Sequence, residues 1–225
     1  MRKLLRTSVL ATAATATVLS LAVVPSASAE DATWTSTPGG AVTGTNVGNL
    51  IGRNVTRGAI VSCSDAEASG TVKSGSGLDG TGIASVDTLR FGGYTGDPEI
   101  CEGPSGLAVQ IVVNDLPLEL DAVSYNPTTG VTTGALTNAD AGGITGKLIG
   151  LDDGCEADFV GANGQPGAIP GTFTNSTDRL ATTSGGNLVA TNVNGNCPSN
   201  FIQNGDVVAL EGTFQLNSDQ TLTSP

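Results

Sequence analysis

Apolar and polar residues alternate over much of the chain, most regularly in residues 107–125. Apolar side chains recur at every second position, first at Leu107, Val109, Ile111 and Val113 and then at Leu116, Leu118, Leu120 and Ala122. A period of two is that of a strand with one buried face. Asn114 and Asp115 tolerate a positive φ and bond their own backbone, which favours a tight turn. The stretch is therefore predicted to be a β-hairpin around which the remaining strands are organised.

Further strands are predicted where short apolar or Thr-rich runs lie between turn residues. They are two strands within residues 34–46, separated by the Pro38-Gly39-Gly40 turn, and the segments 59–63, 67–74, 83–91, 131–137, 144–151, 155–160, 171–175, 188–192 and 207–216. Residues 75–82 are predicted to be a Gly-rich turn, and residues 92–105 a loop. Gly212 interrupts the apolar face of the last strand, which indicates a bulge or a close backbone contact there.

No segment has a helical apolar period, and the high Gly, Thr, Ser and Asn content disfavours helices. Strands about 8 to 12 residues apart with turn signals between them are typical of an all-β sandwich or barrel. We expect an antiparallel sandwich with Greek-key or jelly-roll connections, and a barrel is the alternative. Residues 55–125 and 147–216 share an order of cysteine, short strand, Gly-rich turns and long strand. This echo indicates either a distant internal duplication or chance similarity in a Gly- and Thr-rich chain.

The first residues have the pattern of an export signal. Arg2, Lys3 and Arg6 precede an apolar run over residues 9–24, and Ala27-Ser28-Ala29 follows it. A basic start, a short apolar stretch and an A-x-A site make a secretory signal peptide, so residues 1–29 are expected to be removed. Residues 30–225 then form a single secreted β domain. No second apolar run approaches the ~20 residues of a membrane span, and we expect a released extracellular protein.

The chain is strongly acidic, with 9 Lys and Arg against 21 Asp and Glu. Removal of the signal peptide takes three basic residues and leaves six, so the mature net charge is −15. Such a surface repels nucleic acid and anionic membranes and keeps an exported protein soluble. We therefore expect neither as a partner.

All four cysteines, Cys63, Cys101, Cys155 and Cys197, follow the signal peptide. An even number in an exported chain predicts two disulfides. Of the three pairings, Cys63–Cys101 with Cys155–Cys197 is preferred, because these close loops of similar length and leave the predicted hairpin free between them. Each should stabilise the fold by roughly 3 to 4 kcal/mol. A zinc site is disfavoured because the chain has no CxxC spacing and no His.

The absence of His excludes a Ser-His-Asp or Cys-His catalytic group, a His-ligated metal and a His general base. Carboxylates remain, and Glu119 with Asp121 on the polar face of the predicted hairpin is the candidate pair for glycoside hydrolysis. Acidic residues that alternate with leucines are more typical of a solvated strand face, and the chain has few aromatic residues for a sugar site. We therefore predict no catalytic residues and no cofactor.

Calcium is the metal that best suits an acidic, His-free extracellular chain, because it takes carboxylate and carbonyl oxygens. Residues 75–79, GSGLD, resemble one copy of the calcium-binding GGxGxDx repeat, and residues 152–153 and 192–196 are rich in oxygen ligands. Such repeats bind by stacking, and neither of the other segments has EF-hand spacing. No metal ligand is therefore assigned, and a structural calcium ion stays a secondary alternative.

The signal peptide, the ATWTSTPGG start at residues 32–40, the Thr-Gly segments and YNPTTG at residues 125–130 together resemble small secreted Gly- and Thr-rich β proteins of high-GC Gram-positive bacteria. The resemblance implies an extracellular β protein without an assigned activity, so no functional residue is carried over. We expect a non-catalytic protein with a structural or interaction role at or near the cell surface. The alternatives are a binding module for a wall glycan or a protein partner, such as a protease, and a carboxylate-dependent glycoside hydrolase.

Overall fold

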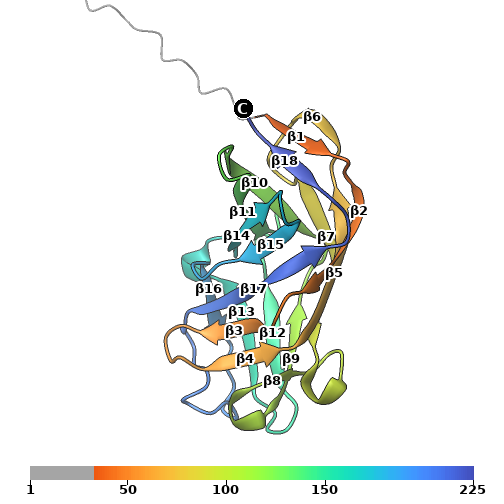
Figure 1. Cartoon of the computed structure of the whole chain (residues 1–225). Coiled ribbons are helices and arrows are strands. Elements are labelled where there is room, and N and C mark those ends of the chain that lie inside the picture. The colour runs from red at the N-terminus through yellow and green to blue at the C-terminus, as the bar shows by residue number, and fades with distance from the viewer. Residues whose placement is uncertain (1–32) are drawn as a thin grey trace, which may run out of the picture. The chain divides into compact units, whose positions relative to one another are not determined.

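The structure is a computed structural model in which residues 33–225 are described, so the predicted signal peptide lies outside the described residues. These residues belong to one compact unit and form eighteen β-strands and three short 3-10 helices, with no α-helix among them (Figure 1). The all-β class predicted from the sequence is confirmed. Within residues 33–225 no helix is long and apolar enough to cross a membrane.

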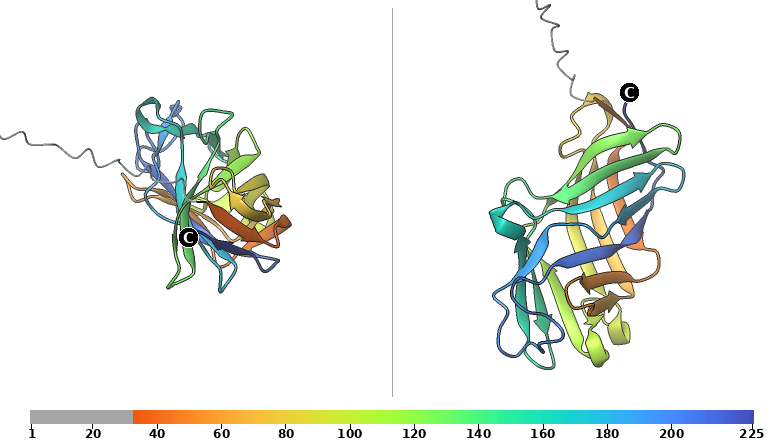
Figure 2. Two further views of the ribbon diagram at one scale, coloured as in Figure 1. Left: turned by 90° about the horizontal axis from the view of Figure 1, so that it is seen from above. Right: turned by 90° about the vertical axis from the view of Figure 1, so that its left-hand side faces the viewer.

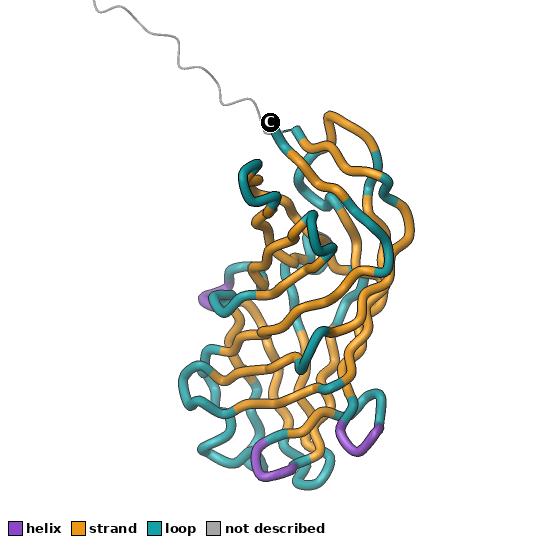
Figure 3. The backbone as a smooth tube through the Cα atoms, in the orientation of Figure 1, coloured by secondary structure: helices purple, strands orange, loops and turns teal. Residues whose placement is uncertain are grey.

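The strands of the first half are β1 (Trp34–Thr37), β2 (Gly40–Asn46), β3 (Leu50–Asn54), β4 (Ile60–Cys63), β5 (Asp65–Val72), β6 (Gly75–Leu78), β7 (Ala84–Gly92), β8 (Cys101–Glu102), β9 (Ala108–Val113) and β10 (Leu118–Asn126). Those of the second half are β11 (Val131–Thr137), β12 (Gly146–Gly150), β13 (Glu156–Gly161), β14 (Ile169–Thr174), β15 (Arg179–Thr182), β16 (Leu188–Thr191), β17 (Val208–Leu216) and β18 (Thr221–Thr223). The 3-10 turns η1 (Tyr94–Gly96), η2 (Pro104–Gly106) and η3 (Ala162–Gly164) lie in connections between strands (Figure 3).

Eight strands close into an antiparallel barrel. Their order is β15-β14-β11-β10-β7-β5-β2-β17, and β17 pairs back with β15 to complete the ring. The closing pair runs from Thr182 opposite Gly212 to Arg179 opposite Gln215. The barrel alternative, rather than the sandwich expected first, therefore describes this part of the fold.

A second sheet continues from the other half of β17. Residues 208–211 of β17 pair with β3, whereas residues 214–216 pair with β2 of the barrel. From β3 the sheet runs through β4, β8, β9, β12, β13 and β16, and a bridge between Val189 and Val207 brings its last strand back beside the start of β17. The barrel and the second sheet thus lie end to end and share one long strand (Figure 2).

A small three-stranded sheet, β18-β1-β6, covers the end of the barrel near the C-terminus (Figure 1). We call it the cap. Strand β1 buries Trp34 and Ser36 and exposes the alternate residues. Trp34, Ile83 and Leu222 form a cluster that packs on residues of β10 and β14. The turn predicted over residues 75–82 was wrong for residues 75–78, which form β6 and pair with β1.

Residues 107–125 form two strands, as predicted, but the hairpin was wrong. Strand β9 pairs with β8 and β12, whereas β10 pairs with β7 and β11. The buried face was predicted correctly at Val109 and Leu118, which are fully buried, but not at Leu116, which is exposed. Residues 114–117 carry the chain from the second sheet to the barrel. A period of two identifies a strand but not its neighbour, and Pro117 has no N–H to donate across a tight hairpin.

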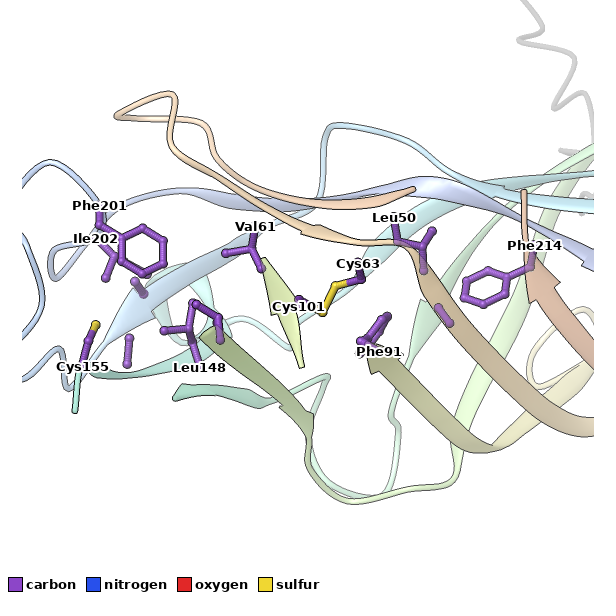
Figure 4. Packing of buried hydrophobic residues seen from close by; sticks show 14 residues of the cluster. Leu50, Val61, Cys63, Phe91, Cys101, Leu148, Cys155, Phe201, Ile202 and Phe214 are labelled. Atoms are coloured by element: carbon purple, nitrogen blue, oxygen red, sulfur yellow. A yellow bond between two sulfur atoms is a disulfide. The ribbon is translucent and has the colours of Figure 1, made fainter. Parts of the chain in front are cut away.

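The largest cluster of buried residues fills the second sheet and extends to the barrel (Figure 4). The disulfide Cys63–Cys101, with an S–S distance of 2.04 Å, lies inside this cluster and joins β4 to β8. The second disulfide joins Cys155 to Cys197 at 2.08 Å. The preferred pairing of the four cysteines is therefore confirmed. The duplication of residues 55–125 and 147–216 stays a prediction.

The close contact predicted at Gly212 is also present. This glycine lies in the middle of β17, where the barrel and the second sheet meet. A Cβ atom at this position would lie 1.8 Å from Cδ2 of Leu50, which is fully buried. The glycine therefore leaves the space that Leu50 occupies at the junction.

Candidate functional site

The two carboxylates nominated from the sequence lie on the outer face of β10. Asp121 accepts hydrogen bonds from the N–H of Gly82 at 2.7 Å and from Oγ1 of Thr137 at 2.9 Å, one on each carboxylate oxygen. Glu119 also lies beside Gly82, because a Cβ there would be 3.6 Å from its carboxyl group. Asp121 thus links β10 to the loop before β7 and to β11, which is a structural role.

Carboxylates in the segments nominated for calcium accept hydrogen bonds from backbone N–H groups. Asp79 accepts the N–H of Thr81 at 2.9 Å, and this hydrogen bond lowers the pKa of the Asp79 carboxyl. Asp152 accepts the N–H of Ala108, also at 2.9 Å. Among residues 33–225 no three Asp, Glu or Cys side chains are placed to hold a metal ion together. Asp79 thus stabilises a turn and Asp152 ties residues 151–155 to β9, and calcium binding stays a prediction.

Three connections meet at the end of the molecule opposite the cap (Figure 1). They are residues 93–107, residues 151–155 and residues 192–206, and together we call them the rim. The turn 151–155 bonds to Ala108, which directly follows residues 93–107, and to the loop over residues 192–206. Leu151 donates its N–H to the carbonyl of Ala108 at 2.9 Å, and Asn194 donates its side-chain N–H to the carbonyl of Gly154 at 2.9 Å.

The loop over residues 93–107 is fixed although it contains little regular structure. The N–H of Tyr94 donates to the carbonyl of Ile100 at 2.8 Å, and the Tyr94 hydroxyl donates to the carbonyl of Gly106 at 2.9 Å. The disulfide from Cys101 ties the middle of the loop to β4. The loop therefore presents its exposed side chains from a defined backbone.

The loop over residues 192–206 is anchored by two apolar side chains and by the second disulfide. Phe201 and Ile202 are buried in the core of the second sheet, and Cys197 is bonded to Cys155. The exposed side chains of this loop are mostly neutral amides: Asn192, Asn196, Asn200, Gln203 and Asn204. The loop thus offers uncharged hydrogen-bond donors and acceptors to solvent.

Asp206 is the buried ionised group at the end of this loop, with 3% of its surface exposed. Its carboxylate accepts the side-chain N–H of Asn54 and the backbone N–H of Gln203, each at 2.8 Å, and forms an ion pair with Arg57. Burial alone would raise the pKa of Asp206, but the hydrogen bonds from Arg57, Asn54 and Gln203 outweigh it and hold the pKa below its usual value. The network fastens the loop to the β3–β4 connection.

A cavity of about 140 Å³ lies within the barrel beneath the cap. Its wall is almost wholly apolar, and many of the lining residues are small, including Ala68, Gly70, Ala84, Gly134, Gly171 and Ala181. At the 24 cal/mol per Å³ found for engineered cavities, this volume corresponds to about 3 kcal/mol of lost packing. A cavity of about 100 Å³ lies in the core of the second sheet, lined by Val61, Phe91, Ile111 and Leu148 among others.

Two hydroxyl groups in the lining of the barrel cavity have no hydrogen-bond partner among the described residues: those of Ser36 and Thr132. The residues are 1% and 3% exposed, so solvent does not reach the hydroxyls from outside. Ser36 comes from the cap and Thr132 from strand β11 of the wall. A buried hydroxyl without a partner costs about 1 to 3 kcal/mol.

The sequence did not reveal the cavity or its two hydroxyls. The available signal was the run of Gly and Ala at inward positions of consecutive strands, which leaves volume in a closed barrel. Of the rim, the loop over residues 92–105 was predicted, but the hydrogen bonds of the 151–155 turn to its neighbours were not.

The described residues define an antiparallel β-barrel with an attached second sheet, a disulfide-stabilised loop end and an apolar interior cavity. Comparison with protein-family models, with curated proteins and with solved structures finds no match for this chain.

Proposed function

We propose that the mature chain is an exported, non-catalytic protein that binds a partner at or near the cell surface through the rim. The observation that carries the proposal is the fixed geometry of the rim loops, each held by a disulfide and by hydrogen bonds to neighbouring segments. Preorganised loops on a rigid scaffold lose little conformational entropy on binding. Export is supported by the signal-peptide pattern, the resemblance to secreted Gly- and Thr-rich proteins, and the two disulfides, which form in oxidising compartments.

The exposed groups of the rim suit a partner that presents both hydrogen-bond donors and acceptors. Neutral amides cover the loop over residues 192–206, while Glu99, Glu102 and Asp152 add carboxylates on the neighbouring segments. Peptidoglycan and a secreted polypeptide both present such groups, and the experiment below separates these two partners.

The test is co-sedimentation of the purified mature protein with peptidoglycan, together with a pull-down of secreted proteins. A double variant, Glu99→Lys and Asn200→Lys, places positive charge on two exposed rim positions. Thr128→Lys is the matched control, because Thr128 lies in the exposed turn between β10 and β11, away from the rim (Figure 1). We expect the double variant to retain about a tenth or less of wild-type binding and the control to bind normally. Equal binding by all three proteins, or no binding to either partner, would refute the proposal.

The non-catalytic part of the proposal is supported by the structural role of Asp121, whose two oxygens hold the Gly82 amide and the Thr137 hydroxyl. A general acid or nucleophile needs a carboxyl group that is free to meet the substrate. A screen of glycoside substrates should therefore show no turnover. Turnover that is abolished by Glu119→Gln with the fold intact would identify the protein as a hydrolase instead.

A further inference from the structure

We propose that the barrel cavity is a binding site for a small, mostly apolar molecule about the size of one six-membered ring, which carries a single hydroxyl or carbonyl group. Ser36 or Thr132, whose hydroxyls have no partner among the described residues, hydrogen-bonds that group. The cavity lies under the cap, at the other end of the molecule from the rim, so this site does not depend on the function proposed for the rim.

The size of the ligand follows from the volume of the cavity. The barrel cavity measures about 140 Å³. An engineered cavity of about 150 Å³ lined by aliphatic and aromatic side chains stays dry and binds benzene. Aliphatic residues, among them Leu120 and Leu136, and two aromatic side chains, Phe173 and Phe214, line the cavity here. A single ring or an aliphatic chain of similar bulk therefore fits.

The polar group of the ligand follows from the two hydroxyls. Each hydroxyl has one donor and two acceptor positions, and neither uses them with any described residue. A hydroxyl on the ligand can donate to or accept from either side chain, whereas a carbonyl can accept from either. A wholly apolar ligand would leave both side chains unpaired. The lining thus favours a molecule with one polar end.

Access is through the cap, because the wall of the barrel is a closed ladder of paired strands. Two strands of the cap, β1 and β6, are paired with each other over fewer residues than neighbouring strands of the barrel wall. They share only the pairs Trp34 with Leu78 and Ser36 with Gly75, with a register shift between them. Separation of β1 from β6 also moves Ser36, so ligand entry and recognition involve the same strand.

Phenol and toluene are the matched probes, since they have the same number of non-hydrogen atoms and differ in a hydroxyl against a methyl group. Their dissociation constants are measured by calorimetry and by the emission of Trp34, the only tryptophan of the chain, which packs in the cap. Phenol loses hydration on entering an apolar cavity, so only hydrogen bonds inside can compensate. We expect phenol to bind the wild-type protein at least as tightly as toluene does.

Ser36→Ala combined with Thr132→Val removes both hydroxyls with little change in shape. We expect the affinity for phenol to fall at least about tenfold and the affinity for toluene to be unchanged or higher. Ala84→Leu fills the cavity and should abolish binding of both probes while circular dichroism and the melting temperature show a folded protein. Ordered water alone could satisfy the hydroxyls, and in that case neither probe binds. That outcome would overturn the proposal, as would a wild-type protein that binds toluene more than tenfold more tightly than phenol.

Discussion

Gly212 shows how one missing side chain sets the geometry of the junction between the barrel and the second sheet. We predict that Gly212→Ala destabilises the protein by about 1 to 3 kcal/mol, because the new Cβ and Leu50 require the same space. Urea unfolding gives the free energy. The control is Gly195→Ala, since a Cβ at Gly195 has no atom within 4 Å and its φ is not positive. A loss of the same size in both variants would refute the steric explanation.

Asp206 makes a second prediction at the scale of one residue. We expect Asp206→Ala to lower the free energy of unfolding at neutral pH by about 3 kcal/mol, because Arg57 and Asn54 lose their buried partner. Asp87→Ala, at an exposed carboxylate, should change the stability by less than about 0.5 kcal/mol.

The pH dependence of this effect follows from the direction of the pKa shift. The pKa of Asp206 is lowered in the folded protein, so its contribution is fully present above the pKa of an unfolded Asp. The contribution is lost as the pH falls through the lowered folded value. The difference in stability between wild type and Asp206→Ala should therefore narrow in acid. A difference that is independent of pH would show that the ionised form of Asp206 contributes nothing specific.

At the scale of elements, the alternating pattern identified strands more reliably than their partners. Residues 108–113 and 118–126 form the predicted strands, yet they do not pair with each other: β9 pairs with β8 and β12, and β10 pairs with β7 and β11. Residues 50–54, LIGRN, form β3 without any alternation that the sequence analysis detected, because pairing with β17 and β4 supplies its backbone hydrogen bonds. Pairing depends on long-range packing, which no local pattern contains.

The two disulfides should differ in their resistance to reduction. Cys63 and Cys101 are both fully buried, whereas Cys197 is partly exposed in the rim. A reductant reaches the sulfur of Cys197 first, since thiol–disulfide exchange requires access. We expect mild reduction and alkylation, followed by mass spectrometry, to label Cys155 and Cys197 before the other pair. Earlier labelling of Cys63 would contradict this order.

Reduction of the second pair should also weaken the rim. The disulfide Cys155–Cys197 closes a long loop, and its loss should lower the free energy of unfolding by roughly 3 to 4 kcal/mol. Limited proteolysis should then cut first within residues 192–206, because the loop keeps the burial of Phe201 and Ile202 and its hydrogen bonds but loses its covalent tie.

At the scale of the whole molecule, the shared strand β17 joins the two cores into one cooperative unit. We predict a single unfolding transition for Val109→Ala in the second sheet and for Leu118→Ala in the barrel, each shifted to lower denaturant by a loss of about 2 kcal/mol or more. Trp34 fluorescence reports the cap end, and far-UV circular dichroism reports all strands. Two separate transitions in either variant would mean that the barrel and the second sheet unfold independently.

The rim and the barrel cavity differ in how far they could be predicted from the sequence. The four cysteines and the loops around them were predictable, since redox compartment and turn residues are local properties of a sequence. The cavity was not predictable. Ser36 and Thr132 are far apart in the chain, and they line the same cavity only because the strands close into a barrel. The small residues that line the cavity are indistinguishable in the sequence from those of any Gly-rich strand, because the sequence does not show which of them face the inside of the barrel.

The pairing of β1 with β18 brings the two ends of the described chain side by side. Thr35 lies opposite Thr223, and the Ser224 hydroxyl donates to the carbonyl of Thr33 at 3.1 Å. A short peptide linker could therefore join residue 225 to residue 33, and new ends could be opened in the exposed turn at residues 127–129. Such a circular permutant should keep both disulfides and the barrel, and its engineered ends would still point away from the rim.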